Sequence, residues 1–312
     1  MKNKLIVLLG PTGVGKTDLS IRIALNLGCE IISADSRQFY REMKIGTAVP
    51  SDKQLKQVRH HFVRFLHVTK YYSSSLFERD VLLLLPQLYE KNNQVIMTGG
   101  SAMYIDAVCN GIDEIPDVDL SIREKYITKY RTEGIESLRL ALKIMDPAHY
   151  HRVDLKNPMR LIRALEICET TGRPYSSFLK KTKTEQGDNS GKGVQRDFKI
   201  IKIGLERQRD ELYKRINMRV DQMISDGLEK EAAGLQHLKD LTALNTVGYK
   251  EFFDYFDGKI TREKAVELIK RNTRRFAKRQ LTWWAKDKEI RWFRADRKDE
   301  IMEYIKNVSA SL

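Results

Sequence analysis

The residues with the clearest chemical potential lie close to the N-terminus. The pattern G-x-x-x-x-G-K-[S/T] is matched at every fixed position by Gly10-Pro11-Thr12-Gly13-Val14-Gly15-Lys16-Thr17. Glycines allow such a loop to turn its backbone N–H groups inward around phosphate oxygens. Lys16 would place a positive charge on the phosphates, and the Thr17 hydroxyl could be a ligand for Mg²⁺. This segment therefore predicts a phosphate site.

The motif alone leaves the nature of the phosphate open, with ATP or GTP as the default ligand. Enzymes that cleave these nucleotides usually hold Mg²⁺ with an acidic residue at the end of a later strand. The candidate strand at 94–98 runs into Gly99, Gly100 and Ser101 and brings no carboxylate. This absence argues against ordinary nucleotide hydrolysis.

Asp35 is a second candidate, because it directly follows the apolar stretch 30–34. In a doubly wound sheet the carboxyl ends of neighbouring strands border one crevice, so Asp35 would lie near the 10–17 loop. Its carboxylate could take a proton from an acceptor or position Mg²⁺ through water. A cap at a helix N-terminus is an equally common role for Asp after a strand, so position alone leaves both open.

The elements that must position these residues follow from the hydrophobic pattern. Four short apolar runs predict buried strands at 4–9, 30–34, 94–98 and 198–205. Helix-capable stretches separate the first three, which is typical of a parallel sheet covered on both faces. We therefore predict an α/β fold, a P-loop core with a mainly parallel sheet flanked by helices.

A change of composition after Gly111 predicts an insertion in this core. Residues 111–117 form a turn-rich exit, the following stretch has helical patterns without a convincing strand, and 186–193 is a Gly- and Ser-rich flexible loop. One apolar helical stripe contains Leu161, Ile162, Leu165, Ile167 and Cys168. The expected domains are a catalytic core of 1–111 and 186–312 and a helical insertion of 112–185.

The charge of the chain points to a polyanionic partner. Its 312 residues carry 56 Lys and Arg against 42 Asp and Glu, a formal net charge of +14. The densest patch is 270–279, with six basic residues and no acidic one. It predicts an amphipathic helix with a cationic outer face, although a solvated charged face is the commoner explanation of such a run. The residues assigned to its inner side are Val266, Ile269, Phe276, Ala277 and Trp284.

Other patterns exclude several classes of protein. Cys29, Cys109 and Cys168 include no C-x-x-C pair, which favours three reduced, mostly buried thiols over disulfides or zinc. His60 and His61 have no carboxylate or thiol at ligand spacing, so packing or hydrogen bonding is expected there. No apolar run approaches the roughly 18 residues of a membrane span, and the first apolar run is too short for a signal peptide. We expect a cytosolic protein.

An ordered set of further segments accompanies the 10–17 loop. These segments are 31–40, 43–48, 60–61, 98–104, 157–166, 247–250 and 273–283. Together they cover nearly the whole chain and resemble the bacterial tRNA dimethylallyltransferases, also called tRNA isopentenyltransferases. That family transfers a dimethylallyl group from dimethylallyl diphosphate to the exocyclic amine of the adenine 3′ of the anticodon.

The resemblance implies a role for each matching residue of the reaction centre. Residues 10–17 would hold the diphosphate of the donor, with Mg²⁺ as cofactor on Thr17. Thr12 would hydrogen-bond the bridging oxygen of the leaving diphosphate, Asp35 would take the amine proton, and Arg219 would grip the diphosphate. An allylic carbon that leaves with cationic character needs such stabilisation of the negative leaving group.

The resemblance also implies that the anticodon arm of tRNA is a partner. Gln38 could hydrogen-bond the edge of a flipped adenine, and the basic helix could contact backbone phosphates. The residues assigned to tRNA are Asp35, Ser36, Arg37, Gln38, Ser101, Arg123, Met159, Arg160, Leu161, Ile162, Arg163, Val247, Gly248, Tyr249, Lys250, Arg274, Arg275 and Lys278.

Three alternatives remain at this point. A P-loop small-molecule kinase would explain residues 10–17 but would leave the basic helix without a role. An adenylate isopentenyltransferase, which uses a free nucleotide as acceptor, would not need a broad cationic surface. An RNA-binding switch protein with a degenerate 10–17 loop would bind tRNA without prenyl transfer. We also expect a monomer.

Overall fold

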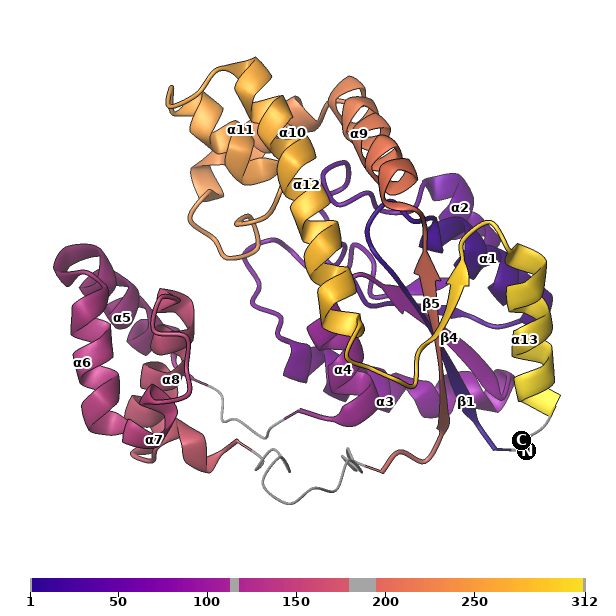
Figure 1. The fold of residues 1–312 in the computed structure, drawn as a ribbon, viewed down its shortest axis with the longest axis horizontal. Helices are drawn as coiled ribbons and strands as arrows, with labels where there is room; N and C mark the ends of the chain where they lie inside the picture. Colours follow the sequence, from indigo (N-terminus) through magenta and orange to yellow (C-terminus); the bar gives the residue numbers. More distant parts are fainter. Residues whose placement is uncertain (1, 113–117, 180–194, 311–312) are drawn as a thin grey trace. The chain divides into compact units, whose positions relative to one another are not determined.

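The computed structural model describes residues 2–112, 118–179 and 195–310 (Figure 1). Its chain divides into two compact units, one formed by Met1–Gly111 with Gly193–Leu312 and the other by Ile112–Lys192. The predicted flexible loop at 186–193 and most of the predicted turn at 111–117 lie outside the described residues.

The larger unit is built on a six-stranded sheet in which every pairing is parallel. The strand order is β3-β2-β4-β1-β5-β6. The strands are β1 (Lys4–Leu9), β2 (Ile31–Ser33), β3 (His60–His61), β4 (Gln94–Gly99), β5 (Lys199–Glu206) and β6 (Arg291–Arg294). The predicted α/β fold with its mainly parallel sheet is confirmed, as are the four predicted strands.

Strands β3 and β6 were not predicted from the sequence. Each lies at an edge of the sheet, where a strand has one neighbour and needs no continuous apolar run. β3 is a pair of half-buried histidines, and β6 has two adjacent half-buried aromatic residues between two exposed arginines. Neither pattern has the hydrophobicity by which a buried strand is recognised.

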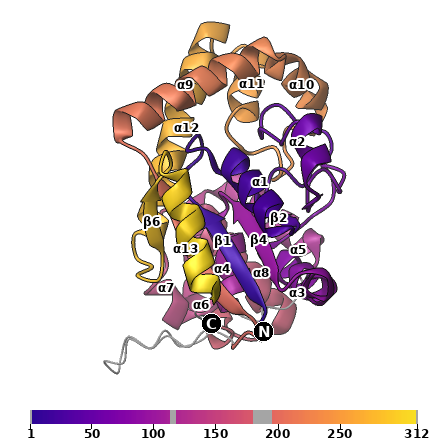
Figure 2. The same cartoon turned by 90° about the vertical axis from the view of Figure 1, so that its right-hand side faces the viewer.

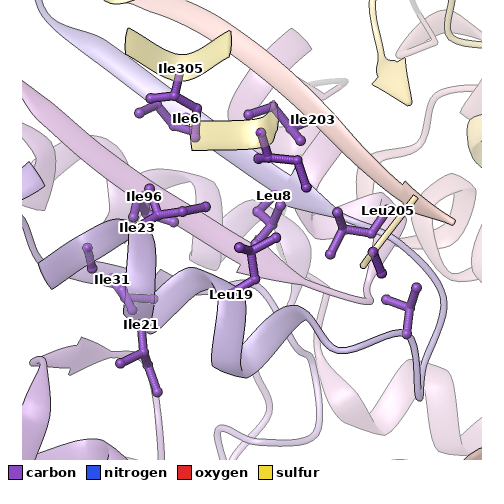
Figure 3. Packing of buried hydrophobic residues seen from close by; sticks show 14 of the residues in the cluster. Ile6, Leu8, Leu19, Ile21, Ile23, Ile31, Ile96, Ile203, Leu205 and Ile305 are labelled. Carbon is purple, nitrogen blue, oxygen red and sulfur yellow. The ribbon is translucent and has the colours of Figure 1, made fainter. Parts of the chain in front are cut away.

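Two apolar clusters cover the faces of the sheet. Because successive side chains of a strand point to opposite faces, β1 sends Ile6 and Leu8 into one cluster and Leu5, Val7 and Leu9 into the other. The first cluster is completed by α1 (Lys16–Leu27) and α13 (Lys298–Ala310), which lie along β1 in Figure 2. Its packing is drawn in Figure 3. The second cluster is completed by α3 (Ser74–Lys91) and α4 (Ala102–Asn110).

A third apolar cluster joins the remaining helices of this unit to the 43–48 segment. These helices are α9 (Arg209–Ser225), α10 (Leu228–Leu235), α11 (Tyr249–Phe256) and α12 (Arg262–Trp284), while the short α2 (Asp52–Gln57) precedes β3 and the one-turn η2 (Gln236–Leu238) follows α10. Helix α12 contains the basic patch predicted for 270–279.

The inner face of α12 differs from the prediction at one residue. Ala265, Ile269, Ala277, Gln280 and Trp284 are buried, at the spacing of one helical stripe. Phe276 is 39% exposed, so its assignment to the core side was wrong. It precedes Ala277 by one position, and a step of about 100° turns its side chain away from that stripe and into the lining of a cavity.

The smaller unit is helical in the residues described. It contains α5 (Leu120–Glu133), α6 (Ile135–Met145), α7 (Pro147–Tyr150), α8 (Pro158–Thr171) and the one-turn η1 (Tyr175–Ser177). Its core includes Tyr126, Leu138 and Leu142 together with Leu161, Ile162 and Leu165 of the predicted apolar stripe on α8. That stripe, from Leu161 to Cys168, is buried as predicted.

The cysteines and the helices agree with two further expectations. Cys29, Cys109 and Cys168 are free and buried, and burial raises the pKa of Cys29 and of Cys109 to about 12. Such thiols stay protonated and unreactive at neutral pH. Among the helices that the structure describes, none has the length and apolar content needed to cross a membrane.

Candidate active site

A cavity of about 670 Å³ opens at the carboxyl ends of β1, β2 and β4, within the larger unit. It is lined by residues of the 10–17 loop, the segment after β2, the 46–48 segment, Ser101, α9 and α12. The sequence therefore brings together Thr12, Lys16, Asp35 and Arg219, as predicted, although Asp35 and the 10–17 loop follow strands separated by β4.

The 10–17 loop has the geometry that its glycines allow. Gly13 and Gly15 have φ values of 81° and 111°, in the left-handed region, and α1 begins at Lys16 directly after them. The Nζ atom of Lys16 turns back into the loop and donates to the carbonyls of Gly10 at 2.7 Å and Pro11 at 3.0 Å. A bound anion would give this ammonium group a stronger partner than two neutral carbonyls.

Electrostatics at the loop favour an anionic ligand. Burial, and secondarily the charge of Arg219, lowers the pKa of Lys16 to about 7, while Asp35 acts in the opposite direction. The pKa of Arg219 is also lowered, first by burial and further by Arg215, against the opposing effect of Asp35. The cavity thus holds positive groups that are poorly compensated in the free protein.

Three arginines hold successive residues of the loop. Arg219 Nη1 donates to Thr12 Oγ1 at 3.2 Å, Arg215 Nε to the Gly13 carbonyl at 2.9 Å, and Arg207 Nε to the Val14 carbonyl at 2.9 Å. Sequence reasoning named Arg219 alone. The i, i+4 spacing of Arg215 and Arg219 on a helix was the available signal for a second arginine on the same face.

Gln280 is another residue that sequence reasoning missed. Its Oε1 accepts from the Thr12 amide at 2.8 Å and its Nε2 donates to the Gly100 carbonyl at 2.7 Å. It therefore links α12 to the ends of β1 and β4, beside the hydroxyl of Thr12 that Arg219 contacts. A buried amide in the middle of an apolar helical stripe could have indicated this role.

Asp35 combines the two roles that the sequence left open. Its Oδ1 accepts from the Arg37 amide at 3.0 Å, which caps the turn after β2, and its side chain also lines the cavity. Ser101 supports this turn, because its Oγ accepts from the Ser36 amide at 2.8 Å and donates to Ser36 Oγ at 3.0 Å. Ser101 lies in the cavity lining as well.

Gln38 lines the cavity, but its amide already has partners in the protein. Nε2 donates to the carbonyls of Thr47 and Ala48, both at 3.1 Å, and Oε1 accepts from Ser33 Oγ at 3.2 Å. To read a base edge with the amide hydrogens, Gln38 would have to release Thr47 and Ala48. Its predicted contact with adenine stays a prediction.

The 247–250 segment is divided between cavity and core. Val247, Gly248 and Lys250 line the cavity, whereas Tyr249 is 0% exposed and donates its hydroxyl to Glu231 Oε1 at 2.7 Å. The assignment of the Tyr249 side chain to tRNA was therefore wrong, because helix α11 turns it into the third apolar cluster.

The basic residues of α12 occupy different environments. Arg275 and Lys278 are exposed, as a phosphate-binding surface requires, while Arg274 donates to Asn217 Oδ1 at 2.7 Å and lies over the ring of Tyr213. Arg279, not named for tRNA, lines the cavity beside Phe276.

In the smaller unit, the 159–163 segment presents only part of its residues to solvent. Met159 and Arg160 are exposed, but Leu161 and Ile162 are 0% exposed in the core, so their assignment as tRNA contacts was wrong. Arg163 and Arg123 both donate to Oε1 of the buried Glu166, at 2.6 and 3.5 Å. One carboxylate thus binds two of the three arginines of this unit that were assigned to tRNA, Arg123 and Arg163.

The histidines have the structural roles expected of them, and of the two adjacent tryptophans only Trp284 lies in the core. His60 Nδ1 lies 2.8 Å from the Val58 carbonyl, and His61 Nε2 lies 2.6 Å from Glu30 Oε2. Trp284 is buried, and Trp283, 47% exposed, donates Nε1 to Asp106 Oδ2 at 2.7 Å. Among the described residues there is no group of three or more His, Cys, Asp or Glu that could hold a metal ion.

The parallel sheet, the glycine-rich loop and the cationic cavity define an α/β protein whose strand ends form a cavity suited to an anionic ligand. Comparison with known families narrows this class. The family model described as IPP transferase matches residues 38–287, and the chain belongs to that family.

Curated relatives cover nearly the whole chain. "tRNA dimethylallyltransferase 1" of Bacteroides fragilis is 51% identical over 301 residues, 96% of this chain and 97% of its own length. "tRNA dimethylallyltransferase" of Christiangramia forsetii is 49% identical over 308 residues, 98% of this chain and 99% of its own.

Solved structures have the same fold. The full-length tRNA isopentenylpyrophosphate transferase of Bacillus halodurans is 34% identical, with a TM-score of 0.69 over 98% of this chain and 96% of its own. A eukaryotic dimethylallyltransferase acting on tRNA, 24% identical, has a TM-score of 0.72 over 94% of this chain and 74% of its own, which supports the fold alone.

Proposed function

We propose that this protein transfers a dimethylallyl group from dimethylallyl diphosphate to the exocyclic amine of the adenine 3′ of the anticodon in tRNA. The observation that supports this most directly is the shared cavity, in which a carboxylate, Asp35, and a cationic phosphate loop face one space. Membership of the IPP transferase family favours this reaction over a kinase or a free-nucleotide acceptor.

The reaction needs one bond to form and one to break. The adenine amine nitrogen attacks the first carbon of the dimethylallyl group, the bond from that carbon to the diphosphate oxygen breaks, and diphosphate leaves. Asp35 takes the proton that the amine loses, because an exocyclic amine is a poor nucleophile until a base assists it. Lys16 and Arg219, with Thr12 beside them, stabilise the charge that gathers on the leaving diphosphate.

Mg²⁺ fits this site through a single protein ligand. The Thr17 hydroxyl lies in the cavity lining and makes no hydrogen bond to another described residue. Mg²⁺ typically retains several waters and binds substrate phosphates together with one or two protein groups. When bound, it would supply further neutralisation of diphosphate charge, and Thr17 would hold it.

Direct assay tests the proposed function. The protein is incubated with unmodified tRNA, dimethylallyl diphosphate and Mg²⁺, and the RNA is digested to nucleosides for mass spectrometry. A new nucleoside heavier than adenosine by one dimethylallyl group, mapped to the position 3′ of the anticodon, is expected. Phosphate transfer from ATP to a small molecule, without any modified nucleoside, would refute the proposal.

We further infer that the protein acts in the cytoplasm as a monomer that binds the anticodon arm through the exposed arginines and lysines of α12 and of the smaller unit. Sedimentation of the protein with and without tRNA tests the oligomeric state. Affinity for tRNA that falls steeply with salt is expected from contacts to backbone phosphates.

Donor binding should take up a proton at Lys16. One pH unit above the pKa of about 7, most free molecules hold Lys16 neutral, and a bound diphosphate raises this pKa by offering a negative partner. Affinity is therefore expected to fall with rising pH above that pKa, by up to about tenfold per unit. Calorimetry of dimethylallyl diphosphate binding in two buffers with different ionisation heats measures the uptake.

Lys16→Arg is the matched control, because a guanidinium keeps its proton at every pH tested and takes up none on binding. Protons taken up or released by the ligand are the same for both proteins, so the difference in uptake reports Lys16. Equal proton uptake by the wild type and by Lys16→Arg would show that the pKa of Lys16 does not control binding.

A further inference from the structure

Glu231, on α10, forms an unusual set of contacts outside the cavity lining. Its Oε1 accepts from the amides of Ile45 at 3.1 Å and Gly46 at 3.0 Å, and its Oε2 from the amides of Lys44 at 3.0 Å and Ile45 at 2.9 Å. The hydroxyl of Tyr249 donates to Oε1 at 2.7 Å. One carboxylate thus satisfies three successive backbone amides and a buried phenol.

The same segment is fixed at its other end by Gln38. The 44–48 loop, defined as residues 44–48, offers its Thr47 and Ala48 carbonyls to Gln38 Nε2. Ala48 has a φ of 49°, a left-handed conformation that costs a residue with a Cβ atom free energy and persists only where neighbours enforce it. Glu231 and Gln38 supply that enforcement from opposite ends.

Close packing makes the arrangement specific. A Cβ atom on Gly46 would lie 2.6 Å from the Tyr249 ring, so only glycine permits this approach of the loop to α11. Tyr249 in turn lies between Gly248 and Lys250, which line the cavity together with Gly46, Thr47 and Ala48. These two groups of lining residues, 46–48 and Gly248 with Lys250, form two walls of the cavity. Glu231 itself is not in the lining, so it can act on a ligand only through these two walls.

The two walls belong to the Asp35 side of the cavity. Gln38, which holds the 44–48 loop, lies in the turn that Asp35 caps. Arg37, in the same turn, donates from Nη2 to the Thr242 carbonyl at 3.4 Å. In residues 2–112, 118–179 and 195–310, no hydrogen bond joins the 44–48 loop to the 10–17 loop. The side-chain hydrogen bonds that reach the 10–17 loop from later in the chain come instead from Arg207, α9 and α12.

We propose that Glu231 is a positioning residue for the acceptor: it fixes the 44–48 loop against Tyr249 and so shapes the part of the cavity that receives the adenine nucleotide, without a role in holding the diphosphate. The inference rests on the proposed function. It predicts that the two substrates respond differently to the loss of this carboxylate.

Glu231→Gln tests the inference with almost no change of volume. Both carboxylate oxygens accept from backbone amides, so the NH₂ group of a glutamine would face an N–H donor in either orientation. The KM for tRNA is expected to rise about tenfold, because hydrogen bonds to a charged acceptor are lost. The KM for dimethylallyl diphosphate and the inhibition constant of inorganic diphosphate should stay within about twofold of the wild type.

Glu229→Gln is the matched control on the same helix. Glu229 accepts from Arg262 Nε at 2.7 Å and contacts neither wall, so both KM values should be unchanged. Tyr249→Phe, which removes one donor to Glu231 and leaves the backbone contacts, should raise the KM for tRNA about threefold. It provides the decisive measurement if Glu231→Gln does not fold.

The inference would be overturned if Glu231→Gln raised the KM for tRNA and the KM for dimethylallyl diphosphate by the same factor. It would also be overturned if the variant had a lower melting temperature but an unchanged ratio of these two KM values. In either case Glu231 would contribute to stability alone. An unchanged KM for tRNA in Tyr249→Phe would also overturn the inference. If the wild-type protein transfers no prenyl group, the proposed function fails and the inference fails with it. If the wild type transfers the group but the KM values of the variants do not change as expected, only the inference about Glu231 fails.

Discussion

Replacement of Asp35 by asparagine is expected to reduce prenyl transfer about 10²–10⁴-fold, the range that a positioned general base contributes. The substitution separates the two roles of this residue. Asparagine can still accept the hydrogen bond from the Arg37 amide, which caps the turn, but it cannot take a proton from adenine. Binding of tRNA should therefore remain, while single-turnover transfer measured with saturating substrates should fall.

A second effect of the same substitution can be recognised by its pH dependence. The charge of Asp35 raises the pKa of Lys16, so in Asp35→Asn Lys16 would lose its proton at lower pH and bind the donor less well above neutrality. Loss of the base lowers transfer at every pH, whereas the effect through Lys16 grows as pH rises. Transfer by Asp35→Asn at more than a tenth of the wild-type rate would exclude Asp35 as the base.

The fold could be predicted from the sequence because its signals are local. The central strands are continuous apolar runs, and β1, the 10–17 loop and α1 are recognisable from the one continuous stretch 4–27. The edge strands β3 and β6 could not be predicted, because these short, polar segments become strands only through pairing with their neighbours in the folded protein.

The candidate site could be predicted only where motif residues face the cavity directly. Thr12, Lys16 and Asp35 follow strands, so topology alone places them together. Arg215 and Gln280 contact the 10–17 loop, and Glu231 contacts the 44–48 loop, from helices far away in the chain. Their contacts arise from the packing of α9, α10 and α12. Composition cannot distinguish such side chains from ordinary polar ones.

A motif match also does not separate a segment's inner residues from its outer ones. Leu161, Ile162 and Tyr249 lie within segments assigned to tRNA, yet each is fully buried. In a helix that contacts a partner, roughly half of the residues must face the core that supports it. Leu161 and Ile162 also belong to the apolar helical stripe predicted for 161–168, so their helical phase already conflicted with their assignment to tRNA.

Arg219→Met is expected to have opposite effects on activity and on stability. The guanidinium contacts Thr12 Oγ1 and, among the residues described, forms no ion pair with a carboxylate. Burial lowers the pKa of Arg219, which indicates that desolvation of the charged guanidinium destabilises the free protein. A bound anion would offset this desolvation. Removal of the charge should therefore raise the melting temperature of the free protein by about 1–3 °C.

The same change should lower transfer about 10²–10³-fold, the usual loss when one donor to a developing negative charge is removed. The thermal shift produced by dimethylallyl diphosphate should shrink in parallel, since the ligand no longer relieves an uncompensated charge. Arg209→Met is the matched control: Arg209 is exposed on the same helix, lies over Tyr213 and should alter neither quantity. If the melting temperature fell in Arg219→Met, the charge of Arg219 would already be compensated in the free protein. Arg219 would then stabilise the 10–17 loop, and its charge would not depend on a bound diphosphate for compensation.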